Sequence, residues 1–281
     1  MNYPEYLVRA VSGDKYEPRP DRMSVTRLIG PPLIRTLEML HYDDIEENVE
    51  DKLWALDGIG FDYIMKHYSQ WGLTNIKLEV PFPLHKLTVV AKLDYYDVLN
   101  YILADLKRTS VWSIQDALKY GNKDWEKQLN VYSYLLNSVA PSLRVDKLQI
   151  HSFARDWRPI EKLRFNDYPG KMVVFDIPQW SKSDQINYID AQLQDHIKNP
   201  ERECTPAEKW QKSDQWAVKK AGNKTAKGGK VCNSKAEAEA FINSHPGTKW
   251  EIEFRPGECV RCKTYCNIRQ FCKYAKKGAT K

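Results

Sequence analysis

The sequence predicts an α/β fold, with a mixed central β-sheet flanked by helices and a small C-terminal ββαβ, cysteine-rich module after it. Over residues 1–200 the hydrophobic pattern passes from helical spacing to strand-like alternation and back again. All six cysteines lie after residue 200. Residues 201–281 hold 18 Lys and Arg against 9 Asp and Glu, whereas residues 1–200 hold 25 against 28. We therefore expect a core over residues 1–200 and a basic module over residues 201–281, packed on that core.

The first 75 residues predict mainly helices. Ser24 and Thr26 are suitable helix caps, and Pro31 and Pro32 precede a helix that runs through Leu33 to Leu40. Residues 43–68 form a second, longer stretch with helical spacing.

Residues 76–107 predict a three-stranded meander. The segments IKLEVPF, LTVVAKLDYY and NYILADLK are rich in Val, Ile, Leu and Tyr and are separated by turn residues. Residues 124–137 return to helical spacing with an apolar stripe. Further strands are expected at residues 147–153 and 171–178, and a helix from Asp184 to His196. This order of elements is typical of a mixed sheet with helices on its faces.

Residues after Cys204 predict a small ββαβ unit. WAVKK is followed by a polar loop, by VCNSKAEAEAFINSH and by the strand KWEIEF. Ser234 and Glu237 have the spacing of a capping box at the start of its helix.

The length of 281 residues allows a substantial core. No stretch approaches 18 apolar residues without charge, and the N-terminus has no basic segment followed by an apolar run. We therefore expect a cytoplasmic protein with no membrane partner.

Two carboxylates and a lysine mark the meander. In a hairpin centred on Leu99–Asn100, Asp94 and Asp105 lie opposite one another, at roughly 5 Å, where carboxylates repel unless a cation or a proton lies between them. Lys107 points to the same face as Asp105, because side chains alternate along a strand. This grouping suits phosphodiester hydrolysis with Mg²⁺ or Mn²⁺.

The plain alternative is that these three are ordinary surface residues, since Asp-x-Lys is a common tripeptide. Two features favour the functional interpretation. Asp105 follows the apolar run YILA, an unusual place for an acid, and Gln128 and Tyr132 lie on one face of the next helix.

The order Asp94, then Asp105-Leu106-Lys107, then Gln128-x-x-x-Tyr132 resembles the RecB-type branch of the PD-(D/E)XK nucleases, which includes AddB-like and many phage exonucleases. The contexts ADLKRTS and WEKQLNVYSYLL carry the resemblance, which extends loosely from about Ser24 to Cys272. It implies a restriction-endonuclease-like core and metal-dependent DNA cleavage. Asp94 and Asp105 would bind the metal, Lys107 would be catalytic, and Gln128 and Tyr132 would organise the site or the DNA.

One position departs from the family pattern. A histidine four residues after a glycine usually supplies a further metal ligand, and here Gly58 leads to Asp62. Aspartate is also a hard oxygen donor, so we predict Asp62 as a metal ligand, with His67 as the alternative. Glu79 is a candidate outer ligand, although a solvated strand face explains it equally.

Four thiols are packed into the 14 residues Cys259–Cys272. Cysteines clustered in a cytoplasmic protein favour metal ligation over disulfides, and this spacing suits Zn²⁺ or an iron–sulfur cluster. RecB-type relatives with a [4Fe–4S] cluster use three terminal cysteines and one distant cysteine that usually precedes the nuclease motifs, where this sequence has none. RCKTYCNIRQFC resembles the terminal triplet, which implies Cys262, Cys266 and Cys272 as ligands. We prefer Cys204 as the fourth ligand, because closing the long loop from Cys204 would staple the ββαβ unit to the core. Cys259 is the local alternative, and Cys232 is expected to be structural.

Lysines and arginines of the tail predict a surface for DNA. Their run is either a solvated face or a groove for the phosphate backbone beside the acidic site. It comprises Lys219, Lys220, Lys224, Lys227, Lys230, Arg261, Lys263, Arg269, Lys273, Lys276 and Lys277.

Three functional hypotheses follow. The first is a DNA nuclease, an exonuclease acting on single strands or duplex ends in phage or bacterial recombination, replication or repair, with a recombinase or single-strand-binding protein as a further partner. The second is an inactive DNA-binding accessory protein with the same fold. The third is a zinc-finger-like interaction protein with an incidental acidic hairpin.

Overall fold

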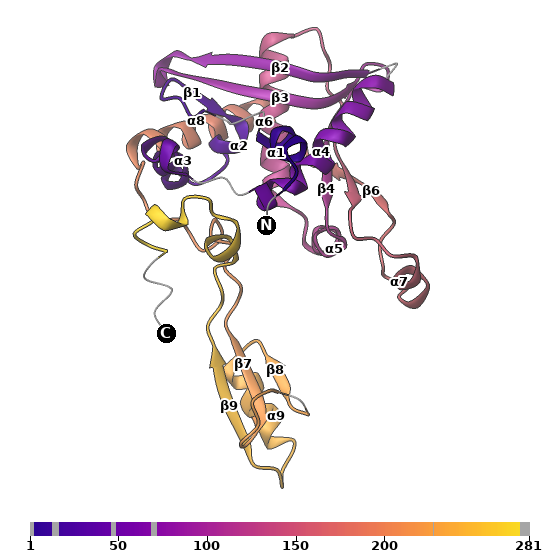
Figure 1. Ribbon diagram of the computed structural model, residues 1–281, viewed down its shortest axis with the longest axis vertical. Coiled ribbons are helices and arrows are strands. Elements are labelled where there is room, and N and C mark those ends of the chain that lie inside the picture. The colour runs from indigo at the N-terminus through magenta and orange to yellow at the C-terminus, as the bar shows by residue number, and fades with distance from the viewer. Residues whose placement is uncertain (1–2, 13–16, 46–48, 69–71, 227, 276–281) are drawn as a thin grey trace. The chain divides into compact units, whose positions relative to one another are not determined.

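The computed structural model describes residues 3–12, 17–45, 49–68, 72–226 and 228–275, and it divides into two compact units, Met1–Arg202 and Glu203–Lys281 (Figure 1). None of the helices in these ranges combines the length and apolar character that a membrane crossing needs.

Unit 1 is built on a six-stranded sheet. Its strand order is β1-β3-β4-β5-β6, with β2 on β3 as well. The β1–β3 and β4–β5 pairs are parallel and the other three pairs are antiparallel, so the predicted mixed sheet is confirmed. The strands are β1 (Arg22–Ser24), β2 (Gly72–Phe82), β3 (Leu87–Asp97), β4 (Ile102–Thr109), β5 (Lys147–Ala154) and β6 (Met172–Ile177).

Helices cover this sheet, as the sequence predicts. Ser24, Ser110, Asn122 and Ser181 cap the starts of four of them, because each side-chain oxygen accepts a backbone N–H of the first turn. The helical elements of unit 1 are α1 (Glu5–Ser12), α2 (Val25–Leu28), α3 (Pro32–Leu40), η1 (Tyr42–Asp44), α4 (Val49–Tyr68), η2 (Pro83–His85), α5 (Val111–Tyr120), α6 (Lys123–Val139), α7 (Pro159–Arg164) and α8 (Lys182–Lys198).

The helix α6 anchors the core. It packs against β2, β3, β4 and β5, and its Leu129 and Leu136 are buried with Leu103 of β4 and Ile150 of β5. Side chains of α6 that point at the sheet are therefore held in place by close packing.

The turn between β3 and β4 fixes the register of the predicted hairpin. Both Leu99 and Asn100 donate their backbone N–H to Asp97 Oδ1 at 2.9 Å. Such a side-chain-to-backbone turn is typical of Asp. The pairs Tyr95–Ala104 and Asp97–Ile102 follow from a hairpin centred on Leu99–Asn100, so the predicted register is confirmed.

Unit 2 contains a small module with the predicted ββαβ order: β7 (Gln215–Lys220), β8 (Lys230–Cys232), α9 (Lys235–Asn243) and β9 (Trp250–Arg255). The antiparallel strand order is β8-β7-β9. Val218, Cys232 and Ala238 are its buried core. Ser234 accepts the Glu237 backbone N–H at 3.1 Å, as the capping-box spacing predicts.

The ββαβ module is inserted into the cysteine-bearing part of unit 2. Gln211 and Cys259 form an isolated antiparallel bridge, and Lys212 donates its N–H to the Glu258 carbonyl at 3.0 Å. The chain therefore leaves and re-enters this part at neighbouring points. The short helical turns η3 (Arg261–Tyr265) and η4 (Arg269–Phe271) follow; Cys262 lies in η3, and Cys266 and Cys272 come directly after η3 and η4.

Candidate active site and cysteine cluster

The candidate site of unit 1 lies where β3 and β4 separate. Their ladder ends at the Tyr95–Ala104 pair, so Asp94 and Asp105 are not ladder partners. Instead, Asp94 Oδ2 accepts the backbone N–H of Leu106 at 2.9 Å. The carboxylate takes the place of a strand carbonyl, which opens the hairpin and fixes Asp94 against the strand that carries Asp105 and Lys107.

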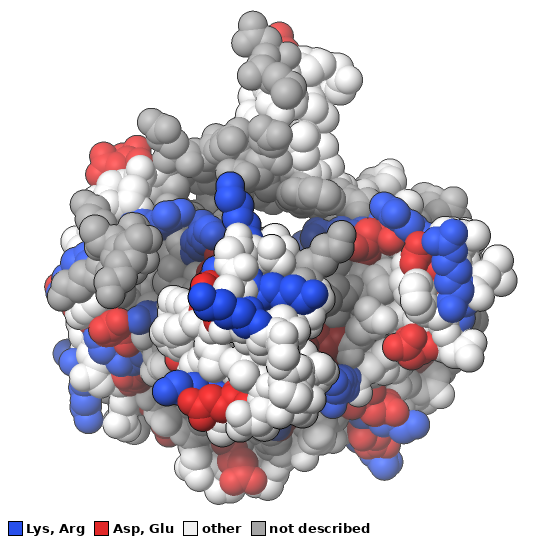
Figure 2. All heavy atoms as spheres, turned by 90° about the horizontal axis from the view of Figure 1, so that it is seen from below, with Lys and Arg blue, Asp and Glu red and all other residues white. Residues whose placement is uncertain are grey.

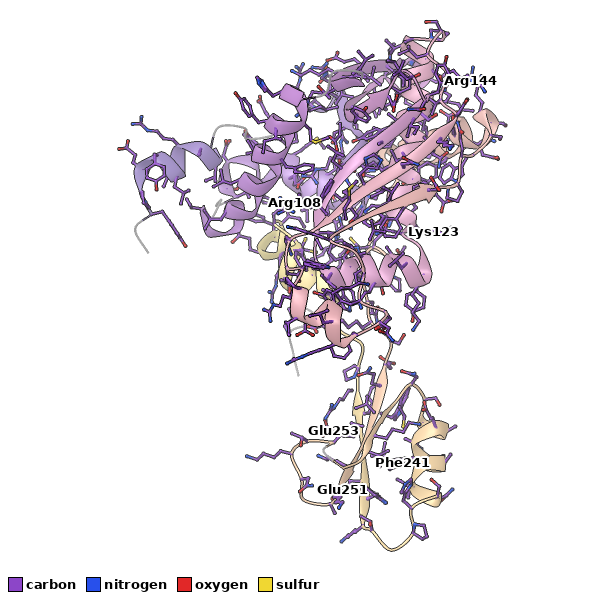
Figure 3. The ribbon with its side chains drawn as sticks, turned by 90° about the vertical axis from the view of Figure 1, so that its right-hand side faces the viewer. Arg108, Lys123, Arg144, Phe241, Glu251 and Glu253 are labelled. Carbon is purple, nitrogen blue, oxygen red and sulfur yellow. The ribbon has the colours of Figure 1, made fainter. Side chains whose placement is uncertain are left out.

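Four side chains form one connected polar group at this opening. In Figure 3, the label Arg108 marks the strand β4 next to Lys107, and the label Lys123 marks the start of α6. Lys107 Nζ lies 2.7 Å from Asp105 Oδ2 and donates to Gln128 Oε1 at 3.1 Å. Gln128 Nε2 lies 3.1 Å from Asp105 Oδ1 and 2.9 Å from the Tyr132 hydroxyl, within donating distance of both. The structure therefore brings Asp105, Lys107, Gln128 and Tyr132 together, with Gln128 as the link.

Burial sets the electrostatics of the group. Asp105 is only 2% exposed, and a buried carboxylate is costly unless it is paired. Burial raises the pKa of Tyr132 well above its ordinary value, and the charges of Asp105 and then Asp94 raise it further. The Tyr132 hydroxyl therefore stays protonated at neutral pH, beside both carboxylates.

The donor chemistry at the opening fits a hard divalent cation. Asp105 Oδ2 is buried and has no well-aligned hydrogen bond, although the Lys107 ammonium lies close to it. Carboxylate oxygens are the ligands that Mg²⁺ and Mn²⁺ prefer. Throughout the described ranges, however, no three His, Cys, Asp or Glu side chains are grouped closely enough to hold a metal ion. The pair Asp94 and Asp105 would thus need ligands from water, from the substrate or from elsewhere in the chain.

The predicted third ligand is not placed. Asp62 belongs to α4, but its side chain lies outside the described residues. His67 is exposed, with its ring stacked on Tyr63 at a centroid distance of 6.5 Å. Glu79 forms an ion pair with Arg22, which favours the solvated-face interpretation of that residue.

Two residues near the site were missed by the sequence analysis. Asn75 of β2 lies opposite Asp94, between the paired residues on either side of it. Its φ of 54° is left-handed, and its buried Oδ1 has no hydrogen-bond partner in the described residues. Ser152 of β5 pairs with Lys107 in the parallel ladder, and its buried hydroxyl also lacks such a partner. An Asn in the middle of a strand was the only signal in the sequence, because Asn tolerates this backbone conformation.

The cysteine cluster of unit 2 consists of Cys204 and the cysteine segment, residues 259–272. All of these thiols are free. Burial, and then the nearby charges of Glu208, Cys262, Cys266 and Cys272, raise the pKa of Cys204 to about 12. Burial also raises the pKa of Cys262, where Cys259 acts as well, and the pKa of Cys266. Cys204 is therefore an electrostatic neighbour of the three cysteines that the resemblance implies.

The cysteine segment is fastened to the chain around Trp210. Arg261 lies over the Trp210 ring at 4.9 Å and donates to the Glu208 carbonyl at 3.1 Å. The Tyr265 ring packs edge-on against the Trp210 ring, with the ring centroids 5.6 Å apart. These contacts fasten residues 261–265 to the chain at Glu208 and Trp210. Cys232, in contrast, is buried in the core of the ββαβ module.

A set of four thiols in partly buried surroundings is suited to a zinc ion or an iron–sulfur cluster, because both bind the thiolate form. Burial opposes ionisation of these thiols when nothing balances their charge. The described residues do not group three of these thiols closely enough for a metal ion, so ligation by Cys204, Cys262, Cys266 and Cys272 stays a prediction.

Comparison with known proteins identifies no matching family model and no matching curated protein. Among solved structures, the chain is similar to the crystal structure of SSO0001, with a TM-score of 0.46 and 14% identity over 73% of this chain and 85% of that one. It is also similar to a phage related exonuclease from Haemophilus somnus 129PT, with a TM-score of 0.37 and 14% identity over 63% of this chain and 91% of that one. The functional assignment therefore rests on the residues of the chain itself.

Proposed function

We propose that this chain is a metal-dependent deoxyribonuclease that hydrolyses phosphodiester bonds, acting as an exonuclease on single strands or duplex ends in phage or bacterial DNA recombination, replication or repair. The observation that supports it most is the connected group of Asp105, Lys107 and Gln128 at the opening between β3 and β4. The order of these residues resembles that of the RecB-type PD-(D/E)XK nucleases.

Asp94 and Asp105 would hold Mg²⁺ or Mn²⁺. Such a cation would polarise the scissile phosphate and lower the pKa of a bound water. Lys107 carries the positive charge that stabilises the phosphate oxygens as negative charge builds on them. Gln128 fixes the position of the Lys107 ammonium and of the Asp105 carboxylate at the same time. Tyr132, kept protonated by its burial, can donate a hydrogen bond without adding negative charge to the site.

Cleavage of end-labelled linear and circular DNA tests the proposal, with Mg²⁺, Mn²⁺ or a chelator present. We expect cleavage only with a metal, and losses on the order of 10² to 10³ or more in Asp105→Ala and Lys107→Ala. Lys182→Ala, at the exposed start of α8, is the control and should cleave normally. Unaltered rates in both site variants would refute the active-site assignment.

The alternative is a DNA-binding accessory protein without cleavage activity. Asp62 in the place of the family histidine favours it, because the described residues contain no third protein ligand beside the two aspartates. DNA binding without metal-dependent cleavage under every condition above would support this alternative.

We propose further that the cysteine cluster holds a [4Fe–4S] cluster, with Zn²⁺ as the alternative. Anaerobically purified protein should be brown and absorb visible light. Colourless protein with stoichiometric zinc would exclude the iron–sulfur assignment.

A further inference from the structure

Two loops meet at one end of the ββαβ module of unit 2. The β7–β8 turn follows Lys220, and the α9–β9 loop ends at Lys249. Lys220 pairs with Trp250 in the sheet, and Ala221 donates its N–H to the Lys249 carbonyl at 2.8 Å. The two loops are therefore joined at the same end of the sheet.

The charges of the module are unevenly paired. Glu253 binds both Lys219, at 2.8 Å, and Arg255, at 2.7 Å. On the helix side, Glu237 binds Lys230 at 2.8 Å. Most basic groups along the body of the module are therefore neutralised by glutamates of the module itself.

The lysines at the joined loops are different. Lys220, Lys224 and Lys249 are exposed, and none has an acidic partner within the described part of the chain. We call these three residues the lysine end. In Figure 2, which views the chain from below, blue side chains extend across the surface nearest the viewer. The nearest acid in sequence, Glu251, lies with Glu253 on the side of the sheet away from Phe241 of α9 (Figure 3).

Each of the two loops at the lysine end contains a glycine with a left-handed φ. Gly222 and Gly247 have φ values of 84° and 89°, and a Cβ at either would meet no atom within 4 Å. A phosphate can therefore approach these turns closely. Trp250 fastens the second loop from inside, because its indole N–H donates to the His245 carbonyl at 3.0 Å and its ring packs on Phe241.

We propose that the lysine end binds the phosphate backbone of DNA and is a second DNA contact of the nuclease, in a different unit from the catalytic residues. This inference rests on the proposed function for the identity of the polyanion. Unpaired ammonium groups beside glycine-containing turns suit phosphates at regular spacing, and they select no base sequence. The contact would hold the enzyme on its substrate between cleavage events.

The test is DNA binding by the full chain carrying Lys220→Glu, Lys224→Glu and Lys249→Glu. Fluorescence anisotropy with a labelled oligonucleotide is measured in the Asp105→Ala background, so that binding is read without cleavage. We expect the affinity to fall about tenfold or more, and the dependence of log K on log salt to become shallower by about 2 to 3. The neutral variant with Gln at the same positions should show a smaller loss, which separates charge repulsion from lost contacts.

The control carries the same charge change at Lys182, Lys198 and Lys235, which lie on α8 and α9. It should bind DNA nearly as the parent does. A lysine-end variant with unchanged thermal unfolding, unchanged affinity and unchanged salt dependence would overturn the inference and would favour an acidic protein as the occupant. Because binding is measured without cleavage, failure here is distinguishable from failure of the nuclease proposal.

Discussion

The polar site of unit 1 and the cysteine cluster of unit 2 are built in different ways. The site uses neighbouring strands and the helix α6, which packs on the core of the sheet, and its side chains are joined by hydrogen bonds. Cys262 lies in a short helical turn, Cys266 and Cys272 directly follow such turns, and contacts around Trp210 fasten this segment to the chain. The first region is organised by the fold, whereas the second would depend on the group that we propose its thiols bind.

This difference predicts where each region is vulnerable. Loss of one side chain from the polar site should disturb chemistry more than folding, because packing of α6 keeps the strands in place. Loss of one thiol from the cysteine cluster should disturb folding, because binding of a structural metal group contributes folding free energy directly.

The largest expected effect comes from Cys262→Ser combined with Cys266→Ser. Structural zinc sites contribute on the order of 10 kcal/mol of apparent binding free energy, so hydrogen exchange of residues 204–211 and 259–272 should become fast. Exchange of β3 and β4 should stay slow. Cys232→Ala is the control, since it removes a buried thiol from the module and leaves the cluster intact. Equal protection of the cysteine segment in parent and double variant would show that the thiols carry no structural group.

A smaller effect is expected at Asp94, where two roles can be separated. Asp94→Ala leaves the Leu106 N–H without its acceptor and should destabilise unit 1 by about 1 to 3 kcal/mol in denaturant unfolding. Asp94→Asn keeps an acceptor oxygen, so its stability should stay close to that of the parent. Both variants should bind Mn²⁺ more weakly in calorimetric titration. Normal Mn²⁺ affinity in Asp94→Asn would restrict this residue to a structural role.

Gln128→Ala should affect the reaction and leave folding largely intact. Residues that orient metal ligands typically change activity or metal affinity by about 10- to 100-fold, and Gln128 contacts both Asp105 and Lys107. The cleavage rate should fall by that factor, while DNA affinity changes little. Gln149→Ala provides a comparison, because that glutamine bonds to Asp176 instead. Equal rates in the two glutamine variants would contradict the linking role of Gln128.

Local patterns in the sequence predicted the parts of the site that lie on regular elements. Alternation placed Asp105 and Lys107 on one face of β4, and helical spacing placed Gln128 and Tyr132 on one face of α6. The separation of β3 from β4 at Asp94 was not predictable, because it depends on a side-chain-to-backbone bond and on a left-handed residue in β2. A prediction that continues the β-ladder in register contains neither the bond from the Leu106 N–H to Asp94 nor the left-handed conformation of Asn75.

The sequence also did not predict which lysines of the basic run form ion pairs. Lys219, Lys220 and Lys230 look alike in a basic run, yet Glu253 and Glu237 neutralise the first and the last. Those glutamates lie on β9 and α9, so the folded module is needed to tell the lysines that are paired with a glutamate from the lysines that are not. Lys227, Lys276 and Lys277 of the predicted run lie outside the described residues.

The smallest expected effect is an acid response confined to unit 1. His196 of α8 is buried, its Nε2 donates to the Leu28 carbonyl at 3.2 Å, and its Nδ1 has no partner in the described residues. Burial lowers the pKa of His196; Arg35 lowers it further, while the Leu28 and Gly30 carbonyls and Asp195 oppose the shift. The unfolded chain therefore binds this proton more readily than the folded one. The stability contributed by the neutral ring is present above the ordinary pKa of histidine, near 6.5, and is lost as pH falls through the lowered folded value.

His196→Gln keeps a donor for Leu28 and cannot take up the proton. The Tm of the parent should therefore fall more than that of His196→Gln between about pH 7.5 and about pH 5. Exchange data resolved by unit should place the difference in α8 and α2, with the cysteine segment unaffected, because every group that shifts the His196 pKa belongs to unit 1. Parallel Tm curves for the two proteins would mean that His196 takes up its proton with the same pKa in the folded and the unfolded chain, and that the acid sensitivity of unit 1 comes from its carboxylates.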